Sequence, residues 1–386
     1  MTEILVLGGG YTGMAATVGL AGRLKGRDDV RITLVNPQTR FTERLRLHQT
    51  ASGQQLADLQ IPDRLAGTSV EFVQGWVTAI DAAVNTVRVD DEYDLRYDIL
   101  VYALGSVADS VTVPGVDEFA YTLNSARDAA ALAHHLDRLR DATVVVAGGG
   151  LTGVESAAEI AEQHPDLDVA LLSRDEPGSM MGAKARARLH AGLRRLGVQV
   201  HAGVDIVKVM ADGVALADGE VVSAQAVLWT TGVRVSPLAA AAGLQVDDRG
   251  RIVTDEVLRS VSHPDVYAVG DAAAIRQSYG VIHGTCQSGI PTSLHAAASI
   301  ARELSGKQPR PFRFGYVHQP VSLGRRDAVI QFTHADDSPG RFYLAGRLAA
   351  AYKETVSSSP WTTYRLIRAI PSIGSMAWRR GAGANR

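Results

Sequence analysis

The chain has 386 residues, of which 46% are hydrophobic and 21% are charged, a composition that excludes a disordered or fibrous protein and allows two or three domains. Its formal net charge of −2 gives no electrostatic basis for nucleic-acid binding, and we predict no metal site. No uninterrupted apolar stretch reaches the ~18 residues of a membrane span, and a first strand near Glu3 leaves no room for a signal peptide, so we expect a cytoplasmic protein.

The first predicted unit opens with an apolar strand over residues 4–7, a glycine-rich turn and an Ala-rich helix start. Glycines at the first, third and sixth positions of such a turn hold a dinucleotide pyrophosphate against a helix N-terminus. They permit the tight turn, the approach of the backbone to the phosphates and close strand-helix packing. The predicted cofactor contacts in this turn are Gly8, Gly10, Tyr11, Thr12 and Gly13.

The second predicted strand, residues 31–36, ends at Asn36, where an acidic residue normally binds the ribose hydroxyls. The Asn36 amide can hydrogen-bond a hydroxyl instead, or it can simply cap the strand. Residues 41–51 are predicted to form a charged helix, and their composition favours a solvated face. Residues 70–89 alternate and are rich in β-branched side chains, which predicts strands of a small antiparallel sheet.

A buried strand is predicted within residues 95–106, and it ends at Gly105 and Ser106, where the backbone would run close to a bound nucleotide. Residues 114–121 are expected to be a linker. Residues 124–139 have the apolar spacing of a helix.

The glycine fingerprint then recurs, again after an apolar run and before an Ala-rich helix start. Two copies in the same strand-to-helix context form an internal repeat and predict a second nucleotide-binding unit. The predicted cofactor contacts here are Gly148, Gly150, Leu151, Thr152 and Gly153.

The second strand of this unit, residues 169–172, is followed by Ser173 and Arg174 rather than by an acid. Both side chains can bind a 2′-phosphate, which favours NADPH or tolerance of both nicotinamide cofactors; alternatively, Arg174 is simply solvated. A helix over residues 184–196 and a strand over residues 226–232, which ends at the candidate contact Gly232, complete the unit.

Residues 265–271 predict a buried strand that ends at Gly270 and Asp271. A carboxylate at a strand tip can accept hydrogen bonds from the ribityl hydroxyls of a flavin, although aspartate is also a preferred helix cap.

Residues 284–291 lead into a predicted helix over residues 292–304. The positive end of this helix could stabilise an anionic reduced flavin, and Thr285, Cys286 and Gln287 are the candidates for its edge. Cys286 is the only cysteine, so an intrachain disulfide and a redox-active thiol pair are excluded. We expect Cys286 to be a small packing residue.

The C-terminal part has a different residue pattern from the two nucleotide-binding units. Residues 319–331 and 341–347 predict antiparallel strands, and residues 348–355 predict a helix, which together would wall an acceptor site. Residues 361–380 mix aromatic residues with arginines and could touch a membrane surface, pack against the protein or form a dimer contact.

The order of these motifs resembles the flavoprotein superfamily with two dinucleotide-binding domains, over about residues 1–310. The resemblance implies an α/β fold, with an FAD domain of residues 1–112 and 246–310, an inserted NAD(P)H domain of residues 113–245 and an α+β domain of residues 311–386. Disulfide reductases of this superfamily carry a cysteine pair in the segment that corresponds to residues 41–51. That segment has no cysteine, so this branch is excluded.

Closer similarity is to type II NADH dehydrogenases and to apoptosis-inducing-factor-like and ferroptosis-suppressor-like quinone reductases. It rests on residues 41–48, on Glu155 and on tail residues 346–361. The resemblance implies FAD, NADH or NADPH and a quinone acceptor, with Arg44 at the cofactor and with Glu155 and Lys353 near the flavin and the quinone.

The chemical roles of these residues have alternatives. Glu155 could bind nicotinamide or relay a proton, or it could only complement the helix dipole. Lys353 could donate a proton to a quinone, or it could be a snorkelling surface lysine. Gln287 is the third catalytic candidate. A reductase of a small metabolite or of a protein partner, and a redox-sensing binding protein, are the alternative functions. Weak peripheral membrane contact and a homodimer are further expectations.

Overall fold

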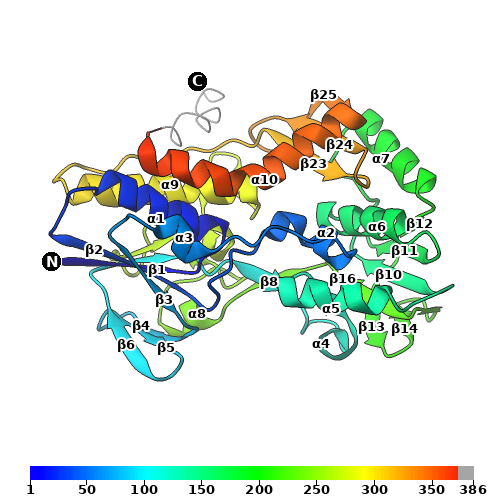
Figure 1. Cartoon of the computed structure of the whole chain (residues 1–386), viewed down its shortest axis with the longest axis horizontal. Helices are drawn as coiled ribbons and strands as arrows, with labels where there is room; N and C mark the ends of the chain where they lie inside the picture. The colour runs from blue at the N-terminus through cyan, green and yellow to red at the C-terminus, as the bar shows by residue number, and fades with distance from the viewer. Residues whose placement is uncertain (373–386) are drawn as a thin grey trace.

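The computed structural model describes residues 1–372, apart from the side chain of Cys286 (Figure 1). Two five-stranded parallel sheets form the centres of two α/β units, and the C-terminal elements lie along one side of both (Figure 1). The predicted fold class, α/β with two Rossmann-like units, is confirmed.

The first sheet has the order β19-β7-β1-β2-β3, and all neighbouring strands are parallel. Its strands are β1 (Thr2–Leu7), β2 (Val30–Asn36), β3 (Val70–Gln74), β7 (Ile99–Tyr102) and β19 (Val266–Ala268). The apolar run of β1 is buried because both faces of this central strand are covered.

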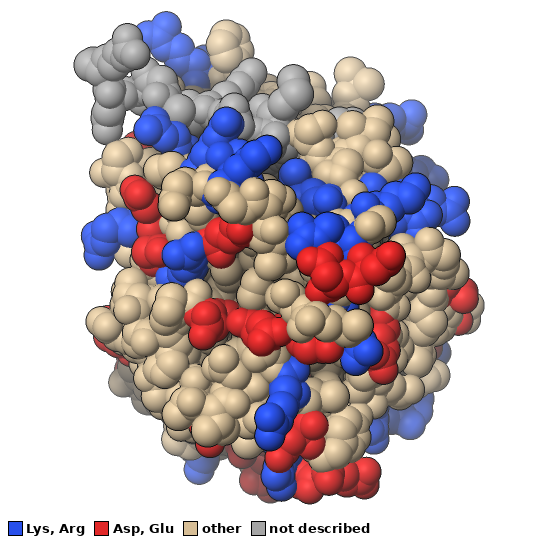
Figure 2. Space-filling model, turned by 90° about the vertical axis from the view of Figure 1, so that its left-hand side faces the viewer, with Lys and Arg blue, Asp and Glu red and all other residues tan. Residues whose placement is uncertain are grey.

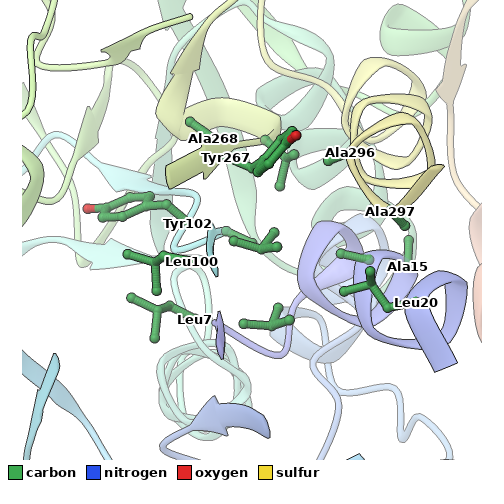
Figure 3. Close-up of a cluster of buried hydrophobic side chains, with 14 of the residues drawn as sticks. Leu7, Ala15, Leu20, Leu100, Tyr102, Tyr267, Ala268, Ala296 and Ala297 are labelled. Atoms are coloured by element: carbon green, nitrogen blue, oxygen red, sulfur yellow. The ribbon is translucent and has the colours of Figure 1, made fainter. Parts of the chain in front are cut away.

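Two helices, α1 (Tyr11–Arg23) and α9 (Cys286–Glu303), pack together on one face of this sheet. Small residues allow the close approach, since a Cβ on Gly19 of α1 would lie 3.2 Å from the Cβ of Ala297. Figure 3 shows the resulting core, in which side chains of the strands face side chains of both helices. The labelled members are Leu7, Ala15, Leu20, Leu100, Tyr102, Tyr267, Ala268, Ala296 and Ala297.

The second sheet repeats this arrangement with the order β12-β11-β10-β16-β9. Its strands are β9 (Tyr121–Thr122), β10 (Thr143–Ala147), β11 (Asp168–Ser173), β12 (Gln199–Ala202) and β16 (Ala226–Trp229). Its helices are α5 (Ala126–Leu136), α6 (Leu151–Gln163) and α7 (Ala183–Arg195). The central strands β1 and β10 each precede one glycine fingerprint, so the internal repeat read from the sequence is structural.

Each unit carries a three-stranded antiparallel sheet at the equivalent point of the chain. These strands are β4 (Val77–Asp81), β5 (Thr86–Val89) and β6 (Tyr93–Arg96) in the first unit, and β13 (Ile206–Met210), β14 (Gly213–Leu216) and β15 (Val221–Ser223) in the second. The units are joined by β8 (Ser106–Ala108) and β17 (Val233–Val235), which pair antiparallel. These connections agree with the expected insertion of one unit into the other, although the domain boundaries themselves stay a prediction.

The C-terminal elements form an antiparallel sheet and a long helix. They are β23 (His318–Ser322), β24 (Ala328–Thr333), β25 (Pro339–Ala345) and α10 (Arg347–Ala369). Helix α10 packs on its own sheet at one end and on α1 at the other (Figure 1). It therefore spans the molecule above both units.

The remaining elements are short. They are a 3₁₀ turn (Arg44–Arg46), α2 (Leu47–Ala51), α3 (Ile61–Leu65), α4 (Val116–Phe119), α8 (Leu238–Ala241), β18 (Ile252–Val253), a 3₁₀ turn (Gly270–Ala272), β20 (Ala273–Ala274), β21 (Arg276–Gln277) and β22 (Gly280–Val281).

Several predicted elements differ from the structure. Residues 70–74 join the parallel sheet as β3, and only the later strands of that region are antiparallel. The predicted linker contains α4. The helix expected from residue 292 begins at Cys286, because Thr285 caps it through a reciprocal pair of hydrogen bonds with Ser288.

The C-terminal helix is the element whose length differs most from the prediction. It was expected to end near residue 355, but it continues through Pro360 to Ala369. Proline removes the N–H that would bond to the carbonyl of Val356, and the hydroxyl of Ser359 donates to that carbonyl instead, at 3.4 Å. Trp361 and Tyr364 are buried, so the packed alternative holds for this part of the tail. The remainder of the predicted tail, residues 373–380, lies outside the described residues.

Candidate functional site

Two glycine turns form matching cradles at the N-termini of α1 and α6. A Cβ on Gly13 would lie 1.6 Å from the carbonyl oxygen of Gly8, and a Cβ on Gly153 would lie 1.8 Å from that of Gly148, so no side chain fits at either place. Gly10 and Gly150, which precede the helices, instead face open space. Each helix therefore presents its first N–H groups to a free volume, as a pyrophosphate requires.

The predicted contacts of the first cradle come together at the strand ends. The Ser106 hydroxyl donates to a carboxylate oxygen of Asp271 at 2.7 Å, which joins the start of β8 to the 3₁₀ turn after β19. Gly270 has a positive φ of 67°, and a Cβ on it would lie 2.6 Å from the side chain of Thr12. Backbone therefore lies close around this cradle, and Asp271 and Thr12 line the same corner.

Three other candidates of the first unit have protein partners. The Asn36 side-chain oxygen accepts from the Gly9 N–H at 2.7 Å, and its NH₂ donates to the carbonyl of Gln38 at 2.7 Å, as the capping alternative requires. Its contact with ribose stays a prediction. The Arg44 guanidinium donates to the carbonyl of Ser106, beside Gly105. Tyr11 packs its ring edge-on against a neighbouring phenylalanine.

The second cradle opens into a cavity of about 620 Å³ that contains Gly232, Ser173 and Arg174. The Ser173 hydroxyl donates to the carbonyl of Asp175 at 2.6 Å, and the exposed Arg174 guanidinium lies 3.7 Å from a carboxylate oxygen of Asp205. Three acids, Asp175, Glu176 and Asp205, line this cavity. Among the described lining residues, three acids and one arginine therefore surround the place where an adenosine ribose would lie.

The catalytic candidates Glu155 and Lys353 form a buried ion pair. The Lys353 Nζ lies 2.9 Å from the Glu155 Oε1, and the side chains are 10% and 8% exposed. The Ser322 N–H donates to the same oxygen at 2.9 Å, and the His48 Nδ1 lies 3.9 Å from the Glu155 Oε2. Elements α2, α6, α10 and β23 thus meet at one carboxylate. The surface-lysine alternative is wrong because α10 turns Lys353 inward.

Burial and charge fix the protonation states of this cluster. Burial alone would raise the pKa of Glu155, but the charges of Lys353 and His48 and the hydrogen bonds from Ser322 and Lys353 outweigh it, so the pKa is lowered. Burial lowers the pKa of His48 to about 4, against the opposing charge of Glu155. At neutral pH the cluster therefore contains a carboxylate beside a neutral imidazole.

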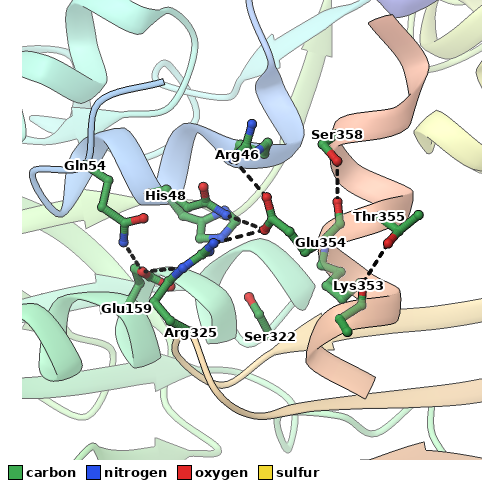
Figure 4. Close-up of polar contacts among 12 residues, drawn as sticks. Arg46, His48, Gln54, Glu159, Ser322, Arg325, Lys353, Glu354, Thr355 and Ser358 are labelled. Atoms are coloured by element: carbon green, nitrogen blue, oxygen red, sulfur yellow. Dashed lines mark hydrogen bonds and ion pairs between the residues drawn. The ribbon is translucent and has the colours of Figure 1, made fainter. Parts of the chain in front are cut away.

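A second ring of charges surrounds the cluster (Figure 4). Glu354 forms an ion pair with the Arg46 guanidinium at 2.8 Å and accepts a hydrogen bond from that of Arg325 at 3.0 Å. A cavity of about 600 Å³ opens here and is lined in part by His48 and Lys353. It gives a small molecule access to the ion pair from outside.

The solvated-face interpretation of residues 41–51 is wrong. Glu43, His48 and Gln49 are buried because α2 packs against α5 and α6 of the second unit. His48 belonged to the segment that carried the family resemblance, but nothing in its local pattern indicated burial. Ser322 had no sequence signal at all, because it reaches the site only through the pairing of β23.

Thr285 and Gln287, two of the candidates at the start of α9, form hydrogen bonds within the fold. The Thr285 side chain caps the helix. The Gln287 NH₂ donates to the carbonyl of His318 at 2.9 Å, and its oxygen accepts from the Val317 N–H at 2.6 Å, which ties α9 to β23. A catalytic role of Gln287 stays a prediction, and the side chain of Cys286 lies outside the described residues. Among residues 1–372, no group of three or more possible ligands could hold a metal ion.

Two parallel-sheet units, each with a glycine cradle at the N-terminus of a helix, are the arrangement of a protein with two dinucleotide-binding domains. The chain matches the pyridine nucleotide-disulphide oxidoreductase family over residues 2–301, and it belongs to that family.

Several proteins that the chain resembles carry NADH in their names or titles. An NADH dehydrogenase-like protein of Mycobacterium tuberculosis is 31% identical, with 85% of this chain and 87% of the relative covered. A type II NADH:quinone oxidoreductase of Staphylococcus epidermidis is 27% identical, with 98% of each chain covered. The structure of NDH2 from Plasmodium falciparum in complex with NADH aligns with a TM-score of 0.80 and 16% identity, covering 98% of this chain and 99% of that one.

Proposed function

We propose that the protein is an FAD-dependent NAD(P)H:quinone oxidoreductase. The observation that carries the proposal is the Glu155–Lys353 pair, which lies beside the second cradle and faces a cavity that is open to an acceptor. The names of the relatives from Mycobacterium tuberculosis and Staphylococcus epidermidis support NADH as the electron donor. The name of the Staphylococcus epidermidis relative also supports a quinone as the acceptor.

The residues of the first cradle fit FAD. Gly10 faces open space at the start of α1, where a pyrophosphate would lie, and Gly8 and Gly13 permit the close backbone packing of the turn. Asp271, oriented by the Ser106 hydroxyl, would accept hydrogen bonds from the ribityl chain. Bound there, FAD would supply the hydride-accepting chemistry that links NAD(P)H to the acceptor.

The buried cluster would supply the proton chemistry at the acceptor. The Lys353 ammonium can donate a hydrogen bond or a proton to a quinone oxygen that enters the cavity. Glu155 holds that ammonium in place through the ion pair, in which the two charged atoms lie 2.9 Å apart. The apolar wall formed by Ala350 and Ala351 would suit a quinone ring.

Charge in the second cradle favours NADH as the donor. The sequence pattern of Ser173 and Arg174 pointed toward NADPH or toward both. Asp175, Glu176 and Asp205 would repel the 2′-phosphate of NADPH, and Asp205 already engages Arg174.

The experiment that tests this function is a comparison of acceptors under steady-state NADH oxidation. Benzoquinones and naphthoquinones should be reduced faster than a ferredoxin-type protein or small metabolites. Fast turnover with a protein or a metabolite and slow turnover with every quinone would favour the alternative reductases. A reduced flavin that no acceptor reoxidises would favour the redox-sensing alternative.

We propose that the protein binds the surface of an anionic membrane and reduces its acceptor there. No helix among residues 1–372 is long and apolar enough to cross a bilayer. Exposed apolar residues lie at both ends of α10, with Leu348 at 75%, Leu366 at 44% and Ile370 at 46% exposure. Figure 2 shows lysine and arginine side chains gathered over the upper part of one face, where α9 and the end of α10 lie.

A groove of about 920 Å³ in this region is lined by basic residues, and none of its described lining residues is acidic. They are Arg23, Arg302, Lys307, Arg310 and Arg313. Such a surface fits anionic lipid headgroups.

The protein should sediment with phosphatidylglycerol vesicles and not with phosphatidylcholine vesicles. Leu348→Glu should weaken vesicle binding, whereas Val233→Glu, at an exposed site on β17, should not. Equal binding to both lipids would overturn the proposal. The expected homodimer stays a prediction.

A further inference from the structure

A second buried carboxylate lies one turn along α6 from Glu155. Glu155, Glu159 and Glu162 are spaced at i, i+4 and i+7, which places them along one face of the helix. Glu159 is fully buried, whereas Glu162 is partly exposed at the end of the row. A row of acids thus runs from the ion pair toward the surface.

Glu159 has polar partners on one oxygen only. The Gln54 NH₂ donates to its Oε1, and the Arg325 Nε lies 3.9 Å from the same oxygen. Figure 4 shows Gln54 and Arg325 pointing at Glu159, with His48 beside them.

Three buried polar atoms of this cluster have no hydrogen-bond partner among the described residues. They are the Glu159 Oε2, the His48 Nε2 and the Gln49 Oε1. Buried polar atoms are rarely left unpaired, and ordered water is the usual partner of such atoms.

The proposed reaction needs a proton from solvent. NAD(P)H, quinone and one proton give NAD(P)⁺ and quinol: the hydride brings two electrons and one proton, and the second proton of the quinol must come from water. The Lys353 ammonium can give that proton only if it is protonated again before the next turnover. Its partner Glu155 is buried, so a path from the surface is required.

We propose that Glu159 carries the solvent proton to the Glu155–His48–Lys353 cluster. The inference rests on the proposed function. Gln54, the partner of Glu159, lines a surface cavity of about 280 Å³, which brings solvent to the outer end of the path. Glu159 acts through Glu155 and His48: it passes the proton to this cluster and does not itself contact the acceptor.

The ionisation of Glu159 suits this task. Burial raises the pKa of Glu159 to about 7. Arg325, from the loop after β23, and the hydrogen bond from Gln54 oppose the rise, whereas Glu162 and Glu155 of α6 add to it. Both protonation states are therefore populated near neutral pH, and the supply of protons should fall as the pH rises through 7.

The test compares E159Q with E162Q. Glutamine keeps the shape and the contact with Arg325 but carries no transferable proton, and Glu162 lies on the same helix face and near the same loop. Stopped-flow absorbance would follow flavin reduction by NADH and then reoxidation by a water-soluble benzoquinone or by ferricyanide, which takes electrons without protons.

For E159Q we expect reoxidation by benzoquinone to be about 10-fold slower or more at pH 7. Reduction by NADH and reoxidation by ferricyanide should be unchanged. E162Q keeps Glu159 but loses a charge that raises its pKa, so it should retain the fall in the benzoquinone rate with rising pH, with the midpoint of that fall at a lower pH. The fall in the benzoquinone rate above pH 7 should disappear in E159Q. Glu159→Asp, which keeps an acid, should restore part of the rate and serves as the second variant if E159Q folds poorly.

A second readout is independent of turnover. Infrared difference spectra of the wild type should show a protonated carboxyl band that titrates near pH 7 and is missing in E159Q. An unchanged benzoquinone rate, or an equal loss with benzoquinone and ferricyanide, would overturn the inference. Failure of the wild type to react with NADH or with any quinone would instead contradict the proposed function.

Discussion

Replacement of Lys353 by methionine should separate the structural and chemical roles of the buried ion pair. Methionine fills a similar volume but leaves the Glu155 carboxylate without its cation, and removing one partner of a buried pair costs about 3–5 kcal/mol. The apparent Tm should fall by about 5 °C. The double variant K353M/E155Q removes both charges of the pair and keeps the Ser322 N–H bonded to an oxygen, so it should recover most of this loss.

The chemical consequence should be confined to the quinone step. We expect K353M to reoxidise with benzoquinone about 100-fold more slowly, equivalent to ~2.7 kcal/mol of lost stabilisation, with little change in flavin reduction by NADH. The assay is anaerobic stopped-flow at pH 7, with the exposed Lys208→Met as the matched control. A K353M variant that is as stable as wild type, or a benzoquinone rate equal to that of K208M, would refute the reasoning.

Three further outcomes are expected. Asp271→Ala should lose FAD on purification, because the ribityl chain loses its acceptor; full retention of bound flavin would remove Asp271 from the cofactor site. NADH should bind at least about 10-fold tighter than NADPH, and Glu176→Gln should narrow the gap by reducing repulsion; equal dissociation constants in fluorescence titrations would contradict the charge argument. Because burial raises the pKa of Glu159 from 4.5 to about 7, the wild type loses stability as the pH rises between those values. Glu159→Gln should therefore gain up to about 3 kcal/mol relative to wild type above pH 7 in thermal melts, and a gain that does not change with pH would argue against this ionisation.

The nucleotide folds could be predicted because their signals are local. A strand, a glycine turn and a helix start are adjacent in sequence, so Gly8 and Gly148 mark their cradles without knowledge of the rest of the chain. Glu155 was equally accessible, because its place on α6 follows from the fingerprint.

The surroundings of Glu155 could not be predicted in the same way. His48 and Ser322 reach it from elements that are far apart in sequence, and their burial depends on how α2 and β23 pack against α6. The length of α10 was misjudged because proline usually ends a helix, whereas here a serine hydroxyl bonds to the freed carbonyl. The i, i+4 spacing of Glu155 and Glu159 is visible in the sequence, but a carboxylate on a helix is ordinarily solvated, so the burial of Glu159 could not be predicted.

The most direct test of the account is a double-mixing experiment under anaerobic conditions. The yellow protein is reduced with one equivalent of NADH and then mixed with one equivalent of benzoquinone, while the flavin spectrum and the quinol are followed together. The account predicts rapid bleaching, full return of the oxidised spectrum and one quinol per NADH. A protein that takes up no FAD, a flavin that NADH does not bleach, or a reduced flavin that persists in the presence of quinone would contradict it.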